Sequence, residues 1–521
     1  MSRAKEANSP KTMPYPKYTS SATLRTKTGC LMCRLKRKKC NEQKPQCSRC
    51  MKSNRVCSWP TQDDLRDRRH RHGSPVPRPS SSSSLEYVSP DPEHVEPLHE
   101  RRPARRPLCI KVSREISPCD DLVASGHFKS DLEVDCFRHF LYEVMPPLIL
   151  PSSHASYRAE YLPATTNMMP MFSGLKNVVL ACGASHKQFH TGNADLYEAG
   201  LNFYSQAVSD VGQALHLVDW KRDGFEDSVL LTVVLLYVHG IIFCGTKRDI
   251  RKHLDGAIQL MTLRCAQSRK APISRPFDRI MWESILYQSF RQSVRNPFWK
   301  DYQPDDKFYQ FAEKVLDSSG FSYMTDRESS PVIGFPLKLQ KFIISVVRVS
   351  QSRVKPDVET LNCLESELKY WESMVIDEQV CMDGGHPDYL LLNSSDRAEA
   401  FNQHSTSLHI LATSLLMHWI KNSHDVSDQP CCHLPPPIDS WQMDRALKIM
   451  TCTESKQGWT RCYLGSWPTL IFGYAASDLR SIEILRRDVQ DRTAQMSSGE
   501  DLVILDELEL VWRQRGFTRE K

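Results

Sequence analysis

The sequence predicts a chain of three unlike parts: a small metal-binding module, a disordered linker and a large all-α domain. Three observations predict this arrangement. Six cysteines crowd into a short N-terminal stretch, Pro, Ser and Arg dominate the next sixty residues, and apolar residues then recur at helical spacing to the end. With 521 residues, of which 40% are hydrophobic, the chain has room for two or three domains and a sizeable core.

The composition changes place the boundaries of these parts. We assign residues 1–27 to a disordered basic N-terminus and residues 28–60 to the metal-binding module. Residues 61–125 form the predicted linker, and residues 126–521 form the predicted helical domain.

The cysteines of the module follow a repeated spacing, C-x2-C-x6-C, in two halves that are six residues apart. A C-x2-C pair at a turn supplies two thiolates to one ion, and zinc prefers four soft ligands in a tetrahedral arrangement. The spacing therefore predicts a zinc site whose six candidate ligands are Cys30, Cys33, Cys40, Cys47, Cys50 and Cys57.

Six sulfur atoms cannot give two zinc ions four separate ligands each, so two cysteines must bridge a binuclear cluster. The first cysteine of each half, Cys30 and Cys47, is the candidate for the bridge. One ion would then be held by Cys30, Cys33, Cys40 and Cys47. The other would be held by Cys47, Cys50, Cys57 and Cys30.

Positive charge is concentrated around this frame. Residues 1–60 hold 15 Lys and Arg against 2 Asp and Glu, a formal charge of +13, and the remainder holds 53 against 60, a formal −7. Five of the cations lie between the second and third cysteines, in the run Arg34-Leu35-Lys36-Arg37-Lys38-Lys39. A basic N-terminal segment followed by a slightly acidic remainder favours nucleic acid as the partner.

This segment resembles the fungal Zn2Cys6 binuclear-cluster DNA-binding domain, in which each C-x2-C begins one of two short pseudo-symmetric helices. The family also has a proline shortly before the fourth cysteine, and Pro45 stands there. The resemblance implies two Zn²⁺ ions per chain. It also implies that Lys36 and Arg37 read a CGG-like triplet in the major groove. Further cations are available for DNA phosphates: Arg34, Lys38, Lys39, Lys44, Arg49 and Lys52.

The resemblance further implies a nuclear, sequence-specific regulator of transcription by RNA polymerase II. Its partners would be double-stranded DNA and the transcription machinery, and its targets a pathway-specific gene set, for example secondary-metabolite genes. Many family members dimerise through a heptad helix after the cluster. After Cys57 this chain has Leu65 and then charged and proline-rich sequence without sustained heptads. Monomeric binding and a homodimer formed through the C-terminal part both stay open.

Other structures fit the cysteine frame less well. A disulfide framework is disfavoured because no hydrophobic signal peptide precedes the cysteines. A zinc module with eight ligands lacks partners at a suitable spacing. The basic run is also compatible with a nuclear-import signal or a solvated helix face. Two rival functions are an adaptor that docks on RNA or protein, and an enzyme in the helical region that is tethered to DNA.

The linker is predicted from composition alone. It includes the run Ser80–Ser84 and the arginine-rich segment 101–106, with few apolar residues. Such a sequence cannot bury enough apolar surface to offset the entropy of ordering.

Five segments after residue 126 carry helical patterns: Val178–Phe189, Leu196–Leu217, Val229–Phe243, His253–Leu260 and Leu502–Trp512. In the second, the apolar positions at helical spacing are Leu201, Tyr204, Val208, Val211 and Leu215. In the last, core packing is expected of Leu502, Leu505, Leu508 and Trp512. The order of these segments resembles the fungal-specific regulatory domain that accompanies binuclear zinc clusters, which implies an all-helical regulatory domain.

Neither a membrane span nor an enzyme is predicted. The most apolar run, Val229–Phe243, is shorter than the roughly twenty residues that a span needs, which favours a buried helix. The sequence holds no P-loop and no G-x-S-x-G, H-E-x-x-H or G-x-G-x-x-G motif. The cluster Cys431-Cys432-His433 lacks a partner pair, so it does not predict a second metal site.

Overall fold

The computed structural model describes two parts of the chain. The first is residues 40–52 without residue 45, together with Cys57 and Trp59. The second is residues 118–517, with gaps at 217–224, 243, 268–272, 300–301, 304, 319–329, 353, 355, 383–393, 423–434 and 453–458. The predicted N-terminal segment, most of the predicted linker and the first of the two expected cluster helices lie outside the described residues.

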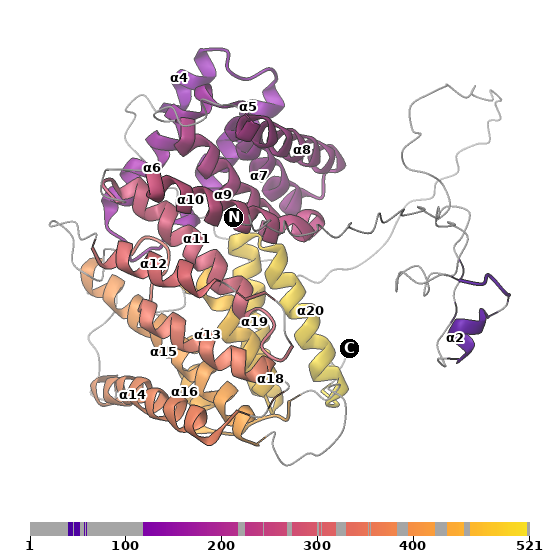
Figure 1. Ribbon diagram of the computed structural model, residues 1–521, viewed down its shortest axis with the longest axis vertical. Coiled ribbons are helices and arrows are strands. Elements are labelled where there is room, and N and C mark those ends of the chain that lie inside the picture. The colour runs from indigo at the N-terminus through magenta and orange to yellow at the C-terminus, as the bar shows by residue number, and fades with distance from the viewer. Residues whose placement is uncertain are drawn as a thin grey trace, which may run out of the picture. The chain divides into compact units, whose positions relative to one another are not determined.

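The chain divides into two compact units, Met1–Leu108 and Cys109–Lys521, each with its own internal contacts. In the described part of the first unit, the helix is α2, Ser48–Lys52. Every regular element described in the second unit is helical, so the expected all-α class is confirmed (Figure 1).

The N-terminal half of the helical domain contains α4 (Pro118–Ala124), α5 (Asp131–His139), η2 (Phe140–Val144), η3 (Pro146–Leu148), α6 (Ala155–Met168), η4 (Met169–Met171), α7 (Ser173–Thr191), α8 (Ala194–His216), α9 (Phe225–Ile242), η5 (Cys244–Asp249), α10 (Ile250–Gln267) and α11 (Pro276–Val294). The C-terminal half contains α12 (Asp306–Asp317), α13 (Leu337–Gln351), α14 (Val358–Met382), α15 (Ser394–Asn422), α16 (Trp441–Thr451), η8 (Tyr463–Gly465), α18 (Ser466–Ala475), α19 (Leu479–Met496) and α20 (Gly499–Gln514). Helix α4 precedes residue 126, where we placed the start of this domain, and that boundary stays a prediction.

Helix α7 is a central element of the N-terminal half, with α5, α8 and α9 packed around it. Its Gly183 allows α5 to approach closely, because a Cβ atom there would lie 2.1 Å from the carbonyl oxygen of Cys136. The helix ends at Gly192, whose φ of 67° is the left-handed conformation that glycine adopts without strain.

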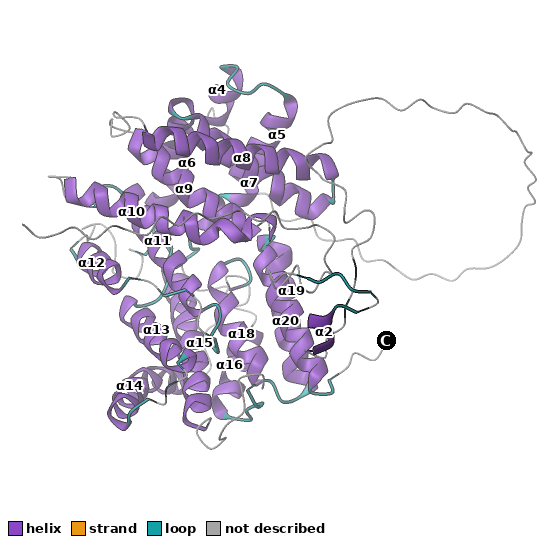
Figure 2. Ribbon diagram, turned by 45° about the vertical axis from the view of Figure 1, so that its right-hand side comes forward, coloured by secondary structure: helices purple, strands orange, loops and turns teal. Residues whose placement is uncertain are grey.

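Helix α9 contains the apolar run that we expected to be a buried helix. By length and composition it is able to cross a membrane, but 78% of it is buried among other helices of the domain. A helix that is apolar on all sides and covered by neighbours is typical of a protein core. It lies beside α7, α8 and α10 (Figure 2), and it also contacts α20.

The last two helices, α19 and α20, lie side by side (Figure 1). Helix α20 buries Ile504, Leu508, Val511 and Trp512, and the Trp512 indole donates a hydrogen bond to the Gly473 carbonyl oxygen at 2.9 Å. Our expectation for the last stripe was wrong at Leu502, which is 40% exposed. The buried face includes Ile504 and Val511 instead, and α20 packs against α9, α18 and α19.

Candidate metal centre

The second half of the cysteine frame begins at a helix start. Cys47 directly precedes α2, and its carbonyl oxygen accepts the first helical hydrogen bond from the Met51 amide at 3.0 Å. The Cys50 amide donates to Cys47 Sγ at 3.4 Å, so the C-x2-C spacing directs both cysteines of the pair to one side of the turn. A short helix that starts at this C-x2-C pair is what the cluster family led us to expect.

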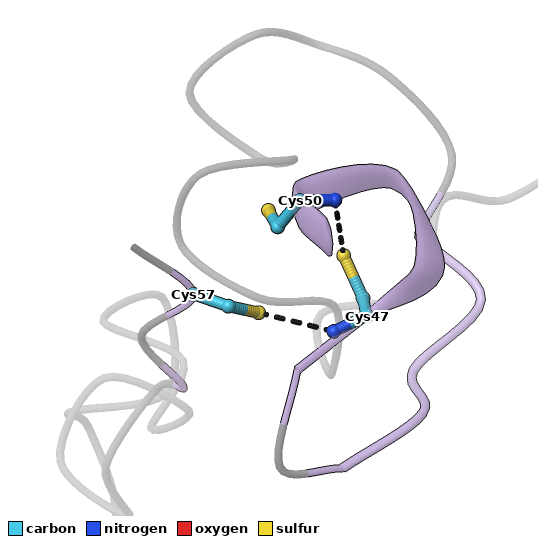
Figure 3. A group of neighbouring side chains, drawn as sticks. All are labelled: Cys47, Cys50 and Cys57. Carbon is cyan, nitrogen blue, oxygen red and sulfur yellow. Dashed lines mark hydrogen bonds between the residues drawn. The ribbon is translucent and has the colours of Figure 1, made fainter. Parts of the chain in front are cut away.

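Three sulfur atoms converge at this turn (Figure 3). The Sγ atoms of Cys47, Cys50 and Cys57 all lie within 4.8 Å of one another. Four sulfurs held tetrahedrally at a Zn–S distance of about 2.3 Å would be about 3.8 Å apart, which is within this spacing. The Cys47 amide also donates to Cys57 Sγ at 3.3 Å and so holds this sulfur next to the turn. This set of soft donors fits a zinc ion.

Within the described residues, few side chains surround the three sulfurs. Cys47 and Cys50 are buried, with exposures of 0% and 3%, and Cys40, Cys57 and Trp59 are the half-buried residues that pack against them. The Cys40 Sγ accepts from the Glu42 amide at 3.4 Å, but it is not one of the three clustered sulfurs. That separation is compatible with the assignment of Cys40 to the other ion, which stays a prediction.

Sequence reasoning missed one residue that supports the site. The Asn41 side-chain oxygen accepts a hydrogen bond from the Ser48 amide at 3.1 Å and so ties the loop between the halves to the start of α2. Glu42 next to it has a φ of 57°. An Asn at the start of a turn is a recognised signal for this kind of side-chain cap.

The predicted DNA contacts are only partly within the described residues. Lys44 and Lys52 are exposed, and the Lys44 ammonium lies 5.7 Å from the centre of the Trp59 ring. Arg49 is on α2 between the clustered cysteines. The remaining predicted site residues lie outside the described part of the chain: Cys30, Cys33, Arg34, Lys36, Arg37, Lys38 and Lys39. Cys431, Cys432 and His433 are outside it as well.

Comparison with known families agrees with both parts of the structure. A family model described as the fungal Zn(2)-Cys(6) binuclear cluster domain matches residues 28–66. A second, described as the fungal specific transcription factor domain, matches residues 135–520 and therefore most of the chain. The chain belongs to the fungal-specific transcription factor family. The expected family and fold class are thereby confirmed, and zinc is the metal that the cluster domain implies.

Individual relatives in this family are similar over limited stretches. Transcription factor lfc1 of Flammulina velutipes is 49% identical over 70 residues, which cover 13% of this chain and 23% of the relative. An uncharacterized transcriptional regulatory protein of Schizosaccharomyces pombe is 26% identical over 251 residues, 43% of this chain and 46% of the relative. The transcriptional regulatory protein moc3 of the same yeast is 54% identical over 48 residues, 9% of each chain. These matches span less than half the length of each relative. No solved structure matches.

Proposed function

We propose that this protein is a nuclear, sequence-specific DNA-binding regulator of transcription by RNA polymerase II, and not an enzyme. The observation that carries the proposal is the convergence of Cys47, Cys50 and Cys57 within a segment that matches the binuclear cluster domain. Its partners are double-stranded DNA and the transcription machinery, and its targets are a pathway-specific gene set. The relatives named as transcription factors and regulators support this class of function.

In the proposed mechanism two zinc ions would be held by Cys30, Cys33, Cys40, Cys47, Cys50 and Cys57, and would keep the module folded. Lys36 and Arg37, on the first half of the frame, donate hydrogen bonds to the guanine edges of a CGG-like triplet. Each good base contact contributes about 1–3 kcal/mol of discrimination against the wrong base. The surrounding cations bind phosphates and supply affinity without sequence preference.

The test is selection of duplex DNA from a random pool by the full-length protein. We expect a CGG-like triplet to be enriched in the presence of zinc and lost in the presence of a chelator. The variant Lys36→Ala with Arg37→Ala should lose the sequence preference but keep weak binding that depends steeply on salt, because phosphate contacts remain.

A matched variant removes the same charge from predicted phosphate contacts. Lys44→Ala with Lys52→Ala should weaken binding to all sequences alike and reduce the salt slope by about one per lysine, with the triplet still enriched. Binding without any enriched sequence would contradict the specific-regulator proposal and would favour the adaptor. Co-purification of a cofactor or substrate would favour the enzyme.

We further propose that the protein dimerises through α8. This helix packs on α7 and α9 and leaves Tyr197, Val208 and Leu215 exposed at 44%, 39% and 45%. Leu201 is half-buried and lies seven residues before Val208, as Val208 lies before Leu215, so the stripe has heptad spacing. Between residues 199 and 215 the one acidic or basic side chain, Asp210, accepts hydrogen bonds from Asn177 and Gln206. A face with a single acidic side chain repels a second copy of itself only weakly.

The oligomeric state in solution tests this arrangement. Val208→Glu with Leu215→Glu should convert a dimer to a monomer in analytical ultracentrifugation, because each interface would then carry like charges. Asn202→Glu with Gln213→Glu adds the same charge at exposed positions off the stripe and should leave the dimer intact. A wild-type protein that sediments as a monomer and selects single triplets would refute the dimer and leave the DNA-binding proposal standing.

A further inference from the structure

A cavity of about 90 Å³ lies inside the helical domain, between its N-terminal half and the last two helices. Helices α9 and α11 form about half of its wall, and the rest comes from η2, η3, α6, α7, η8, α19, α20 and short connecting segments. Several wall residues are only half-buried, among them Leu148, Val238, Ile241, Ser284 and Met496, so the cavity has a mouth toward solvent. It is smaller than the cavity of about 150 Å³ that admits benzene in an engineered protein.

Most of the wall is aliphatic, and two of its tyrosine hydroxyls already have protein partners. Tyr287 donates to the Tyr463 carbonyl oxygen at 3.0 Å, and Tyr463 in turn donates to the Val332 carbonyl oxygen at 2.9 Å. These groups therefore fix the shape of the wall and do not need a ligand to satisfy them.

Two other polar groups of the wall are buried and unsatisfied. Gln288 and Arg291 are 5% and 6% exposed, and both line the cavity from α11. Among the described residues, neither Gln288 Oε1 nor Arg291 Nε has a hydrogen-bond partner. The two residues are three positions apart, which places them on the same face of the helix. An unsatisfied acceptor and an unsatisfied donor thus face one small apolar space.

The charged groups at this site already have partners, and the carboxylate of the wall residue Asp501 lies 3.7 Å from the Arg492 guanidinium. The other end of the Arg291 guanidinium forms an ion pair with Glu500, whose side chain is also buried. A carboxylate or phosphate ligand would be repelled by Glu500, and an ammonium ligand would meet Arg291. A neutral hydroxyl group matches both orphan atoms, because it accepts one hydrogen bond and donates another.

We propose that this cavity binds a small, uncharged, mainly aliphatic molecule with one hydroxyl group, which accepts from Arg291 Nε and donates to Gln288 Oε1. The aliphatic part fills the space beside Val234, Val238 and Ile280. The ligand contacts α9 and α11, which both belong to the N-terminal half of the domain. The inference concerns a binding site in the helical domain and does not depend on the proposed reading of DNA.

The test uses the full-length protein and two isomeric probes, butan-1-ol and methyl propyl ether. Both have the same atoms, but the ether accepts a hydrogen bond and cannot donate one. We expect saturation-transfer NMR to show that both bind, with the ether about tenfold weaker because one buried hydrogen bond is missing. Butan-1-ol at low concentration should also raise the Tm of the helical domain more than the ether does.

Two variants assign the binding to the cavity. Gln288→Leu removes the orphan acceptor and should abolish the preference for the alcohol over the ether. Val238→Phe fills the cavity from its mouth and should abolish the binding of both probes. Gln340→Leu is the matched control, since Gln340 on α13 is an equally buried glutamine with unpartnered side-chain atoms that does not line the cavity. It should keep the preference of the wild type.

Several outcomes would overturn the proposal. If the wild type binds the alcohol and the ether with equal affinity, the assigned hydrogen bond to Gln288 does not form. If neither probe binds detectably, the cavity holds water only. Persistence of the alcohol preference in Gln288→Leu would place the binding elsewhere, and this variant decides the matter even where Val238→Phe fails to fold.

Discussion

His239 is a fully buried histidine in the middle of the helical domain. Its Nε2 lies 2.9 Å from the Ser185 hydroxyl, its Nδ1 lies 3.1 Å from the Thr246 hydroxyl, and the ring stacks on Tyr204. Burial, with a smaller contribution from the nearby His253, lowers the pKa of His239 to about 3. The neutral ring therefore joins α7, α9 and the 3₁₀ turn η5 at every physiological pH.

The low pKa of His239 predicts that acid destabilises the folded domain. The folded-state pKa is below the unfolded value of about 6.5, so the unfolded chain binds more protons between these two pH values. The free energy of unfolding should then fall as the pH drops below 6.5. We expect His239 alone to account for about 2 kcal/mol between pH 7 and pH 5. Urea unfolding of the wild type and of His239→Gln at both pH values measures this difference.

The control for that measurement is His418→Gln, which removes an exposed histidine of α15. It should leave the pH dependence of the wild type unchanged, whereas His239→Gln should reduce it. An equal pH dependence in all three proteins would show that the acid sensitivity has another source, such as the buried His186 or His409, whose pKa values burial also lowers.

At the scale of the helices, the contact between α5 and α7 depends on one missing side chain. A Cβ at Gly183 would meet the Cys136 carbonyl oxygen at 2.1 Å, and backbone atoms cannot move aside as a flexible side chain does. Gly183→Ala should therefore separate the two helices and destabilise the domain by about 1–3 kcal/mol or more. Thermal and urea unfolding would report the loss.

A second helical glycine gives the opposite expectation. A Cβ at Gly256 in α10 would meet only Val233 Cγ1, at 3.9 Å, which is ordinary van der Waals contact. Gly256→Ala should stabilise the domain by about 0.5–1 kcal/mol, because alanine loses less backbone entropy in a helix. If Gly183→Ala and Gly256→Ala change the free energy of unfolding by similar amounts, helix propensity explains both effects. The close approach of α5 to Gly183 would then not limit stability.

The sequence predicted the presence of these helices better than their environment. Helix α9 was recognisable because it is apolar on every side, and only burial in a core or a membrane satisfies such a helix. In α8 the spacing predicted the helix, but Val208 and Leu215 are exposed while Tyr204 and Val211 are buried. Periodicity defines a stripe along one helix, whereas the neighbours that cover it come from distant segments. Leu502 was misplaced for the same reason.

The candidate site shows the same contrast between local and distant relations. Cys47 and Cys50 were predictable because a turn fixes the geometry of a C-x2-C pair within a few residues. The orphan atoms of Gln288 and Arg291 were not predictable, because their surroundings depend on helices up to two hundred residues away in the sequence. A short-range pattern encodes the metal centre, and only the assembled core creates the cavity.

Across the whole molecule, two units differ in what holds them together. In the described part of the first unit, the buried apolar residues are only Cys47 and Cys50, with Cys40, Cys57 and Trp59 packed against them. The second unit has a continuous core that runs from Cys136 to Trp512. A segment as short as residues 28–60 buries little apolar surface, so we expect metal binding to supply its folding free energy, on the order of 10–16 kcal/mol for structural zinc.

Removal of the metal should therefore unfold the first unit and leave the second unchanged. With a chelator we expect rapid proteolytic cleavage within residues 28–60, together with an unaltered Tm for the helical domain. Cys50→Ser should reproduce this cleavage pattern without a chelator, since it removes one of the three clustered sulfurs. Cys363→Ser, which changes an exposed cysteine of α14, should behave like the wild type. Protection of residues 28–60 in the metal-free protein would contradict a zinc-dependent module. A fall in the Tm of the helical domain on chelation would instead show that the metal also stabilises the second unit. The two units would then not be independent in stability.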